Sequence, residues 1–459
     1  MSYISVKNLA EGQAVISLTP LDEDGLVAWR RSAPTRHVNW LEQSGFTAAP
    51  GEVCALPAEN GTLEHRLFGM QSQGDIALLA DLPARLPAGI YRLASNWSRD
   101  QRLRASLGWG LACYRFSRYK AGKNALPELL LDEDIDGEVR KLCTAQCLVR
   151  DLVNTPTEHM GPQQLADEVE RIADKFEADF SSITGDDLLT RNFPAVHVVG
   201  RASHREPRLL QLEWGHEGPL LALVGKGVCF DTGGLDLKPA AGMALMKKDM
   251  GGAAHALALA SLVMAYNLPV RLMLLIPAVE NAVAGNAYRP GDVIATRKGL
   301  SVEIGNTDAE GRVILSDALT FATEHDPDLV IDFATLTGAA RVALGPELPP
   351  LFSNREEISA GIQAAGLEVE DPLWTMPLHQ PYNKLFESPI ADLNNAGNTP
   401  FAGCITAALF LEHFVTPETP WVHIDTFAWN PDSKPGRPKG GEAQGLRAVF
   451  AYLQERYTR

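Results

Sequence analysis

Acidic and basic residues gather in two short glycine-rich segments, one from Gly225 to Gly252 and one at Asn306–Arg312. Their chemistry-bearing members are Lys226, Asp231, Lys238, Asp249, Asp308, Glu310 and Arg312. The first segment directly follows a predicted strand at Leu220–Val224. In open α/β sheets, functional sites form in the loops outside the carboxyl ends of the strands. We therefore ask what these side chains would do if they converged there.

Four carboxylates cannot share a dry cleft as bare anions. Like charges raise one another's pKa, and burying an unpaired anion is costly in free energy. Divalent cations resolve this conflict, and four carboxylates suit two metal ions with one or two bridging ligands. The pattern of Asp231, Asp249, Asp308 and Glu310 therefore indicates a two-metal site.

Other catalytic templates do not fit this sequence. It contains no H-E-x-x-H, no G-x-S-x-G and no G-x-x-x-x-G-K-[ST] string. The loop Gly225–Gly234 has the glycines of a phosphate cradle, but its lysine comes too early for a P-loop. Each of these residues also has an ordinary structural interpretation when it is taken singly. An Asp beside a glycine is typical of a turn, Lys226 could be a surface lysine, and Arg312 could form a salt bridge at the start of a helix.

Taken together, the segments closely resemble the leucyl (cytosol) aminopeptidase family, the M17 metallopeptidases. The string N-T-D-A-E-G-R at Asn306–Arg312 is that family's specific motif. G-K-G-V-C-F-D-T-G-G-L-D-L-K-P from Gly225 and K-K-D-M-G-G-A-A at Lys247–Ala254 match in register, helped by D-F-A-T-L-T-G at Asp332–Gly338. The resemblance runs from about Arg150 to near the C-terminus.

The resemblance implies two sets of metal ligands. One metal ion would be bound by Asp231, Asp308 and Glu310, with the Asp308 carbonyl as a further ligand. The second would take Lys226, Asp231, Asp249 and Glu310, so that Asp231 and Glu310 bridge the pair. Lysine binds a metal only as a neutral amine, and two adjacent dications would lower its pKa toward that state. Mn or Zn is expected, with Mg as a third candidate.

The resemblance also implies a mechanism for releasing the N-terminal residue of a peptide. The free α-amine would bind the second metal near Asp249, and a metal-bridging water would attack the scissile carbonyl. Protonated Lys238 would stabilise the oxyanion, and Arg312 would hold a bicarbonate that acts as general base. Substrates are therefore expected to be peptides with a free N-terminus.

The substrate pocket follows from matching positions. Met246, Thr335 and Gly338 are expected to line it, and an apolar lining would favour hydrophobic, leucine-like residues. Ordinary core packing is an equally good interpretation of these three. Phe427 lies in Trp421–Trp429, which is shorter before the tryptophan than the usual family strand, so the size of the pocket stays open.

The elements that position these residues can be read from the apolar pattern. Continuous apolar runs at Ala195–Val199, Leu220–Val224, Leu272–Ile276 and Leu329–Phe333 predict buried strands, and intervening helices are predicted at Ala253–Tyr266 and Arg312–Glu324. Unbroken strands separated by helices indicate an α/β domain with a largely parallel, mixed sheet covered on both faces.

The length of 459 residues suggests more than one domain. We predict a smaller N-terminal α/β domain at 1–131, with β-like runs at Ala14–Leu18 and Ile76–Leu82. A connecting helix at 132–156 is expected next, and then the di-metal peptidase domain at 157–459. The longest apolar stretch, Ala256–Tyr266, is too short to cross a bilayer, and the first residues show no secretion signal. A cytoplasmic protein without a membrane partner is expected.

Two other functional classes compete with the peptidase. Some bacterial relatives bind DNA, so a DNA-binding regulator or a non-catalytic scaffold of the same fold is an alternative. The formal net charge of -16 argues against DNA as the main partner, although a local basic patch is compatible with it. A two-metal phosphatase would need more arginines than Arg312. The resemblance further implies a homohexamer.

Overall fold

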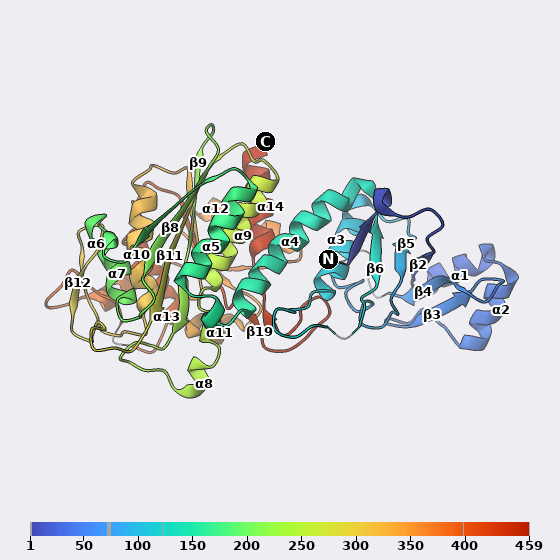
Figure 1. Ribbon diagram of the computed structural model, residues 1–459, viewed down its shortest axis with the longest axis horizontal. Coiled ribbons are helices and arrows are strands. Elements are labelled where there is room, and N and C mark those ends of the chain that lie inside the picture. Colours follow the sequence, from blue (N-terminus) through green and yellow to red (C-terminus); the bar gives the residue numbers. More distant parts are fainter. Residues whose placement is uncertain (1, 71–74, 123, 398, 459) are drawn as a thin grey trace. The chain divides into compact units, whose positions relative to one another are not determined.

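The computed structural model describes residues 2–70, 75–122, 124–397 and 399–458. The chain divides into two compact units, drawn in Figure 1. The first unit comprises Met1–Cys147 and Asp432–Lys439, and the second comprises Leu148–Pro431 and Gly440–Arg459. Their boundary falls inside one long helix, α4 (Glu133–Asn154). Its acidic first turn suits the positive end of the helix dipole.

The first unit is built on a sheet with the strand order β1-β6-β5-β2-β4-β3 among the described residues. Only the β3–β4 pair of this sheet is antiparallel. Its strands are β1 (Tyr3–Ser5), β2 (Val15–Leu21), β3 (Val53–Pro57), β4 (Leu63–Gly69), β5 (Ile90–Leu93) and β6 (Glu128–Leu131). Its further helical segments are η1 (Val6–Asn8), α1 (Glu23–Ser32), α2 (Thr35–Ser44) and α3 (Arg99–Ala112).

The β-like interpretation of Ile76–Leu82 is wrong. This segment forms consecutive turns and buries Leu79 and Leu82. The carbonyl of Ile76 lies so close to Gly108 of α3 that a β-carbon there would collide with it. The apolar residues are therefore used to pack on a helix, and no strand pairing is made.

The second unit contains a large mixed sheet with the order β16-β15-β18-β14-β9-β11-β8-β7, and β10 pairs with β11 beside it. The central strands β18, β14, β9 and β11 run parallel, whereas β15, β8 and β7 add antiparallel pairs toward the edges. The strands are β7 (Asp179–Thr184), β8 (Arg208–Trp214), β9 (Leu220–Gly225), β10 (Gly227–Asp231), β11 (Arg271–Asn281), β14 (Leu329–Ala334), β15 (Pro350–Ser353), β16 (Trp374–Thr375) and β18 (Trp421–Asp425).

Helices cover both faces of this sheet (Figure 1). On one face α7, α10 and α13 share an apolar core with β9, β11 and β14, and on the other lie α5, α9, α12 and α14. The helices are α5 (Pro162–Lys175), α7 (Pro194–Gly200), α9 (Gly251–Ala265), α10 (Glu310–Thr323), α12 (Glu356–Glu368), α13 (Gly403–Glu412) and α14 (Leu446–Thr458). The predicted α/β class, with a largely parallel sheet covered on both sides, is confirmed.

Shorter elements complete the second unit. One small sheet is formed by β12 (Val293–Ala295), β13 (Ser301–Glu303) and β17 (Leu393–Asn394). A second is formed by β19 (Trp429–Asn430) and β20 (Gly440–Gly441). Short helical segments are η2 (Thr157–His159), α6 (Asp187–Thr190), α8 (Ala240–Met243), η3 (Met246–Lys248), α11 (Gly338–Leu344) and η4 (Gln380–Phe386).

One predicted strand of the second unit is wrong. Ala195–Val199 forms helix α7, which starts at Pro194. Proline presets the helical φ at a first helical position. The next two N–H groups, of Ala195 and Val196, donate to Oδ2 of Asp317 at 2.8 and 3.3 Å. A five-residue apolar run cannot distinguish a buried strand from a buried helix, and this tertiary cap decides for the helix.

Candidate metal centre and active site

The ends of β9 and β10 position the first two candidate ligands. Lys226 stands between these strands, and Asp231 is the last residue of β10. Asp231 lies opposite Asn281, the last residue of β11, in the parallel pairing of β10 with β11. Nδ2 of Asn281 donates to Oδ1 of Asp231 at 2.8 Å, which fixes the direction of that carboxylate.

The loop before α10 carries Asp308 and presents Glu310 as the first residue of the helix. Thr307 ties this loop to the first segment. Its N–H donates to Oδ2 of Asp236 at 2.8 Å, and its hydroxyl donates to the carbonyl of Gly233 at 2.6 Å. The two motif segments, far apart in sequence, are thereby held against each other.

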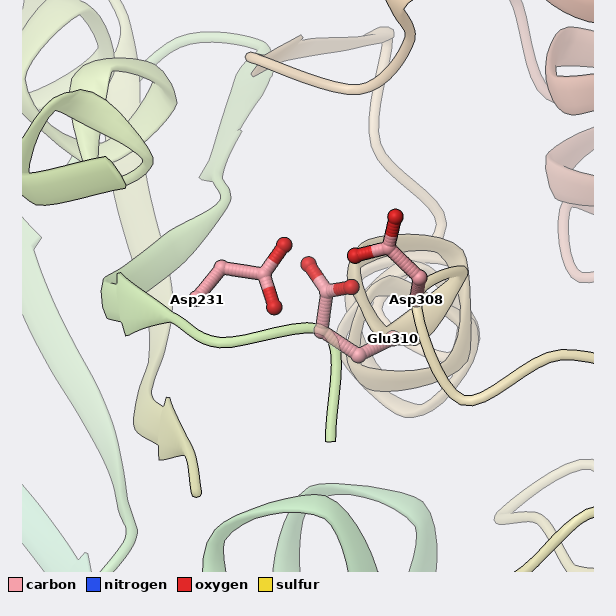
Figure 2. A group of neighbouring side chains, drawn as sticks. All are labelled: Asp231, Asp308 and Glu310. Atoms are coloured by element: carbon pink, nitrogen blue, oxygen red, sulfur yellow. The ribbon is translucent and has the colours of Figure 1, made fainter. Parts of the chain in front are cut away.

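The predicted metal ligands converge. Oxygen atoms of Asp231, Asp308 and Glu310 all lie within 4.8 Å of one another, and Figure 2 shows the three carboxylates facing a common point. The Nζ of Lys226 lies 2.8 Å from Oδ2 of Asp249 and 2.9 Å from Oε1 of Glu310. All five side chains therefore belong to one cluster at the carboxyl edge of the sheet.

The chemistry of this cluster fits divalent cations. Glu310 is 1% exposed; its Oε1 is paired only with the ammonium of Lys226, and its Oε2 has neither a hydrogen bond nor an ion pair. Oδ2 of Asp249 and Oδ1 of Asp308 likewise face only the ammonium groups of Lys226 and Lys238. Buried polar atoms are almost always satisfied, so four carboxylates that share two lysines and leave a buried oxygen without a partner require another explanation. Oxygen donors of this kind are the ligands that Mg²⁺, Mn²⁺ and Zn²⁺ accept.

The pKa values of the cluster reflect the repulsion between buried carboxylates that lie close together. Burial, and then the charge of Asp231, raises the pKa of Glu310 to about 8. The same two causes raise the pKa of Asp308 to about 6. Burial lowers the pKa of Lys226, but the surrounding carboxylates outweigh it and leave that pKa above its usual range. Without cations Glu310 therefore holds a proton more tightly than an ordinary carboxyl group, and Lys226 supplies positive charge beside it.

Lys238 and Arg312 occupy different surroundings. Lys238 lines the cavity next to the cluster, and its Nζ pairs with Asp231 at 2.8 Å and with Asp308. Arg312 donates from Nη1 to the carbonyl of Asn395 at 2.8 Å, and its Nε has no hydrogen-bond partner. Burial lowers the pKa of Arg312 to about 10. Arg312 does not line that cavity within the described chain, although it stands only two residues from Glu310.

The four predicted pocket residues share one cavity with the metal ligands. Met246, Thr335, Gly338 and Phe427 line a space of about 370 Å³ that also contains Asp231, Asp249, Asp308 and Glu310. The hydroxyl of Thr335 lies 2.8 Å from Oδ1 of Asp249 and 2.9 Å from its carbonyl oxygen. One pocket residue therefore also orients a candidate ligand.

Sequence reasoning missed two cations in this cavity. Lys248 and Arg341 both line it. Burial lowers the pKa of Lys248 to about 8. The position of Lys248, next to Asp249 within a matched motif, was a usable signal. Asn281 was missed as well, because an asparagine at the end of an apolar strand reads as a turn residue.

Two family models match this chain. The catalytic domain of the cytosol aminopeptidase family covers residues 147–450, and the M17 aminopeptidase N-terminal domain covers residues 16–132. The chain belongs to the cytosol aminopeptidase family. It is accordingly an aminopeptidase, that is, a hydrolase and a protease. Members of the M17 family bind divalent metal ions, and the carboxylate cluster offers a place for them.

Relatives of this M17 aminopeptidase are similar over most of its length. A probable cytosol aminopeptidase from Syntrophotalea carbinolica is 42% identical over 365 residues, 75% of this chain and 73% of the relative. The crystal structure of the cytosol aminopeptidase from Coxiella burnetii is 47% identical, with a TM-score of 0.95 and 99% of each chain covered. The bottromycin maturation enzyme BotP in complex with Mn is 30% identical, with a TM-score of 0.87 and coverage of 96% and 99%.

None of the helices among the described residues is long and apolar enough to span a membrane.

Proposed function

We propose that this M17 aminopeptidase uses two divalent ions, held by Lys226, Asp231, Asp249, Asp308 and Glu310, to release the N-terminal residue of peptides. The observation that carries the proposal is the buried cluster of four carboxylates that share two lysines and leave Oε2 of Glu310 without a partner. When bound, the ions would neutralise these anions and supply Lewis-acid chemistry that activates a water molecule and polarises the scissile carbonyl. Mn is supported by its presence in the related BotP structure; Zn and Mg are the other candidates.

The restriction to N-termini follows from Asp249 in this proposal. Its carboxylate lines the cavity, and Thr335 holds it through the hydroxyl contact described above. A free α-amine placed there could bind the neighbouring metal ion through its lone pair and donate to this oriented carboxylate, whereas an internal peptide nitrogen has no available lone pair and only one N–H. Peptides with a blocked N-terminus are therefore poor substrates.

Lys238 is proposed to stabilise the oxyanion. Burial lowers its pKa, but Asp231 and Asp308 raise it by more, so the ammonium stays protonated at neutral pH. A charged donor in a half-buried cavity strengthens its interaction as negative charge develops on the carbonyl oxygen. The side chain is 15% exposed, so water screens it only partly.

Arg312 is proposed to hold a bicarbonate that accepts the proton from the attacking water. Support comes from its partly buried guanidinium, whose Nε has no partner and which forms no ion pair with any described carboxylate. An anion at this place would satisfy both the charge and the free N–H. Bicarbonate fits because it carries a single charge and accepts a proton near neutral pH.

A homohexamer in the cytoplasm completes the proposal. Large apolar side chains on the second unit are exposed, including Val342, Leu367 and Phe401. Apolar side chains of this kind mark an interface where they gather into one patch, which is the arrangement that a homohexamer requires. The curated relatives are named cytosol aminopeptidases, which supports the location. Light scattering of the purified protein measures the assembly directly.

Release of p-nitroaniline from L-leucine p-nitroanilide tests the proposed chemistry. Activity should vanish when the protein is stripped of metal, return with Mn or Zn, and be absent for the N-acetylated substrate. No activity with any metal or any amino-acid anilide would overturn the proposal. The preference for leucine-like residues stays a prediction, and two cations in the cavity weigh against it.

A further inference from the structure

The cavity beside the metal ligands is lined by two cations that the proposed mechanism does not use. Lys248 and Arg341 line it together with Met246, Gly338 and Phe427, the part expected to receive the substrate side chain. The Nζ of Lys248 and the Cζ of Arg341 each lie 4.9 Å from the ring centroid of Phe427. The two cations therefore meet at one aromatic ring in the wall of the pocket.

Neither cation forms an ion pair with a carboxylate among the described residues. Within the part of the chain that the structure describes, no carboxylate lies within ion-pair distance of Lys248 or Arg341. Asp249 is the nearest acidic residue in sequence and belongs to the metal cluster. Asp425, which also acts on Lys248, is engaged elsewhere, because it accepts hydrogen bonds from the hydroxyl of Thr337 and the N–H of Leu336.

A pocket for aliphatic side chains does not need such residues. Lys248 is only 6% exposed, and a buried cation without a partner costs free energy that the contact with Phe427 offsets only in part. A methionine or leucine at this position would pack against the ring without that cost. The arrangement suits a pocket in which a negatively charged group of the substrate pairs with the two cations.

The same cavity is lined both by the carboxylates of the candidate metal site and by these two cations. A residue whose α-amine binds at the metal site and whose side chain is negative would match both groups at once. Complementarity of this kind sets specificity.

We propose that Lys248 and Arg341 are specificity residues that select an acidic side chain, aspartate or glutamate, at the N-terminus of the substrate. The inference rests on the proposed aminopeptidase function and names its substrate class. It predicts that leucine is a secondary substrate. The Phe427 ring lies beside both cations in the wall of the pocket.

Anilide substrates test the inference because they carry no C-terminal carboxylate. With the Mn-loaded full-length protein, kcat/KM for the glutamate p-nitroanilide should exceed that for the glutamine and leucine compounds by about ten-fold or more. The variants K248M and R341Q should each lower the glutamate-to-leucine ratio by about ten-fold. R341Q changes an exposed residue and keeps the test intact if K248M fails to fold.

Lys247 provides the matched control. It neighbours Lys248, but its Nζ donates to the carbonyl of Asn154 at 2.6 Å and it does not line the described cavity. K247M should keep the wild-type glutamate-to-leucine ratio. If K248M acted only by disturbing the local structure, K247M should lower the glutamate-to-leucine ratio as well. That result would contradict the inference.

The outcomes separate the two proposals. Metal-dependent hydrolysis of the leucine anilide with little or none of the glutamate anilide overturns the inference and leaves the proposed function standing. A ratio unmoved by K248M and R341Q also overturns it, as does a preference that appears only in dipeptides with a free C-terminal carboxylate. No hydrolysis of any anilide overturns both.

Discussion

A β-carbon on Gly311 would lie 2.6 Å from Cε and 2.7 Å from Nζ of Lys226. The alkyl chain of Lys226 therefore crosses the first turn of α10 at a place that only glycine leaves open. This passage delivers the ammonium group to Asp249 and Glu310. The glycine of the N-T-D-A-E-G-R string thus leaves space for the side chain of Lys226, which comes from the other motif segment.

The first prediction concerns the substitution G311A. The added methyl must displace Lys226, so activity should fall by about ten-fold or more, whereas overpacking should cost about 1–3 kcal/mol of stability, partly offset by the better helix propensity of alanine. The kcat/KM for an amino-acid anilide and the urea midpoint measure the two effects. Wild-type activity in G311A would contradict the proposed place of Lys226 in the site.

The control for that experiment is G137A. Gly137 lies in α4, and a β-carbon there has no heavy atom within 4 Å. The same chemical change should therefore raise the free energy of unfolding by about 0.5–1 kcal/mol and leave activity alone.

The second prediction concerns the orientation of Asp249. Thr335 contacts Oδ1 of Asp249 through its hydroxyl, and T335V removes that contact with little change in volume. Partners that orient a metal ligand typically contribute about 10–100-fold in metal affinity. The Mn concentration that gives half-maximal activity should rise by that factor in T335V and recover in T335S. An unchanged Mn requirement would mean that Asp249 is oriented by other groups or binds no metal.

The third prediction concerns metal removal and Glu310. Metal binds the folded state, so Mn at 100 times its Kd should stabilise the wild type by about 2.7 kcal/mol, and a chelator should remove this gain. E310Q removes one anion from the cluster. The variant should be inactive, more stable than the wild type in chelator, and stabilised less by Mn. Thermal unfolding in chelator and in Mn gives all four values, and an equal Mn gain in both proteins would argue against Glu310 as a ligand.

The site was predictable from the sequence to the extent that it depends on backbone position. Strands such as Leu220–Val224 are apolar without interruption because both faces are buried, and in a parallel sheet their carboxyl ends meet at one edge. A carboxylate just after such a strand, such as Asp231, must then lie at that edge. Asp308 and Glu310 follow β13 of a separate small sheet, and tertiary contacts of Thr307 bring them to the same place.

The remaining features depend on tertiary contacts that leave no periodic signal. Helix α7 replaces a predicted strand because Asp317, far along the chain, caps its first turn. Lys248 reads as a surface lysine in a K-K pair, and only the folded chain shows it beside Phe427 and Arg341. The sequence therefore predicted several residues that line the pocket, but it did not predict that two cations lie together in its wall.

The fourth prediction concerns Asp317, which is fully buried in α10. Its carboxylate accepts from the backbone N–H groups of Ala195, Val196 and Arg297. Burial raises its pKa to about 7, although these hydrogen bonds and the charge of Arg297 act in the opposite direction. The folded state therefore holds a proton at pH values where the unfolded carboxyl, with a pKa of about 3.9, has lost it.

This difference makes stability depend on pH in a defined window. The folded state binds more protons than the unfolded state between about pH 4 and about pH 7, so the contribution of Asp317 to stability falls as pH rises, by at most about 1.4 kcal/mol per pH unit. D317N cannot ionise and should lack this component. Urea unfolding at pH 5, 6, 7 and 8 with equal Mn measures the free energy of unfolding of both proteins. The value for the wild type minus the value for D317N should fall as pH rises to about 7 and then stay constant. A difference that stays constant with pH would show that Asp317 is ionised in the fold throughout, held so by its three backbone donors.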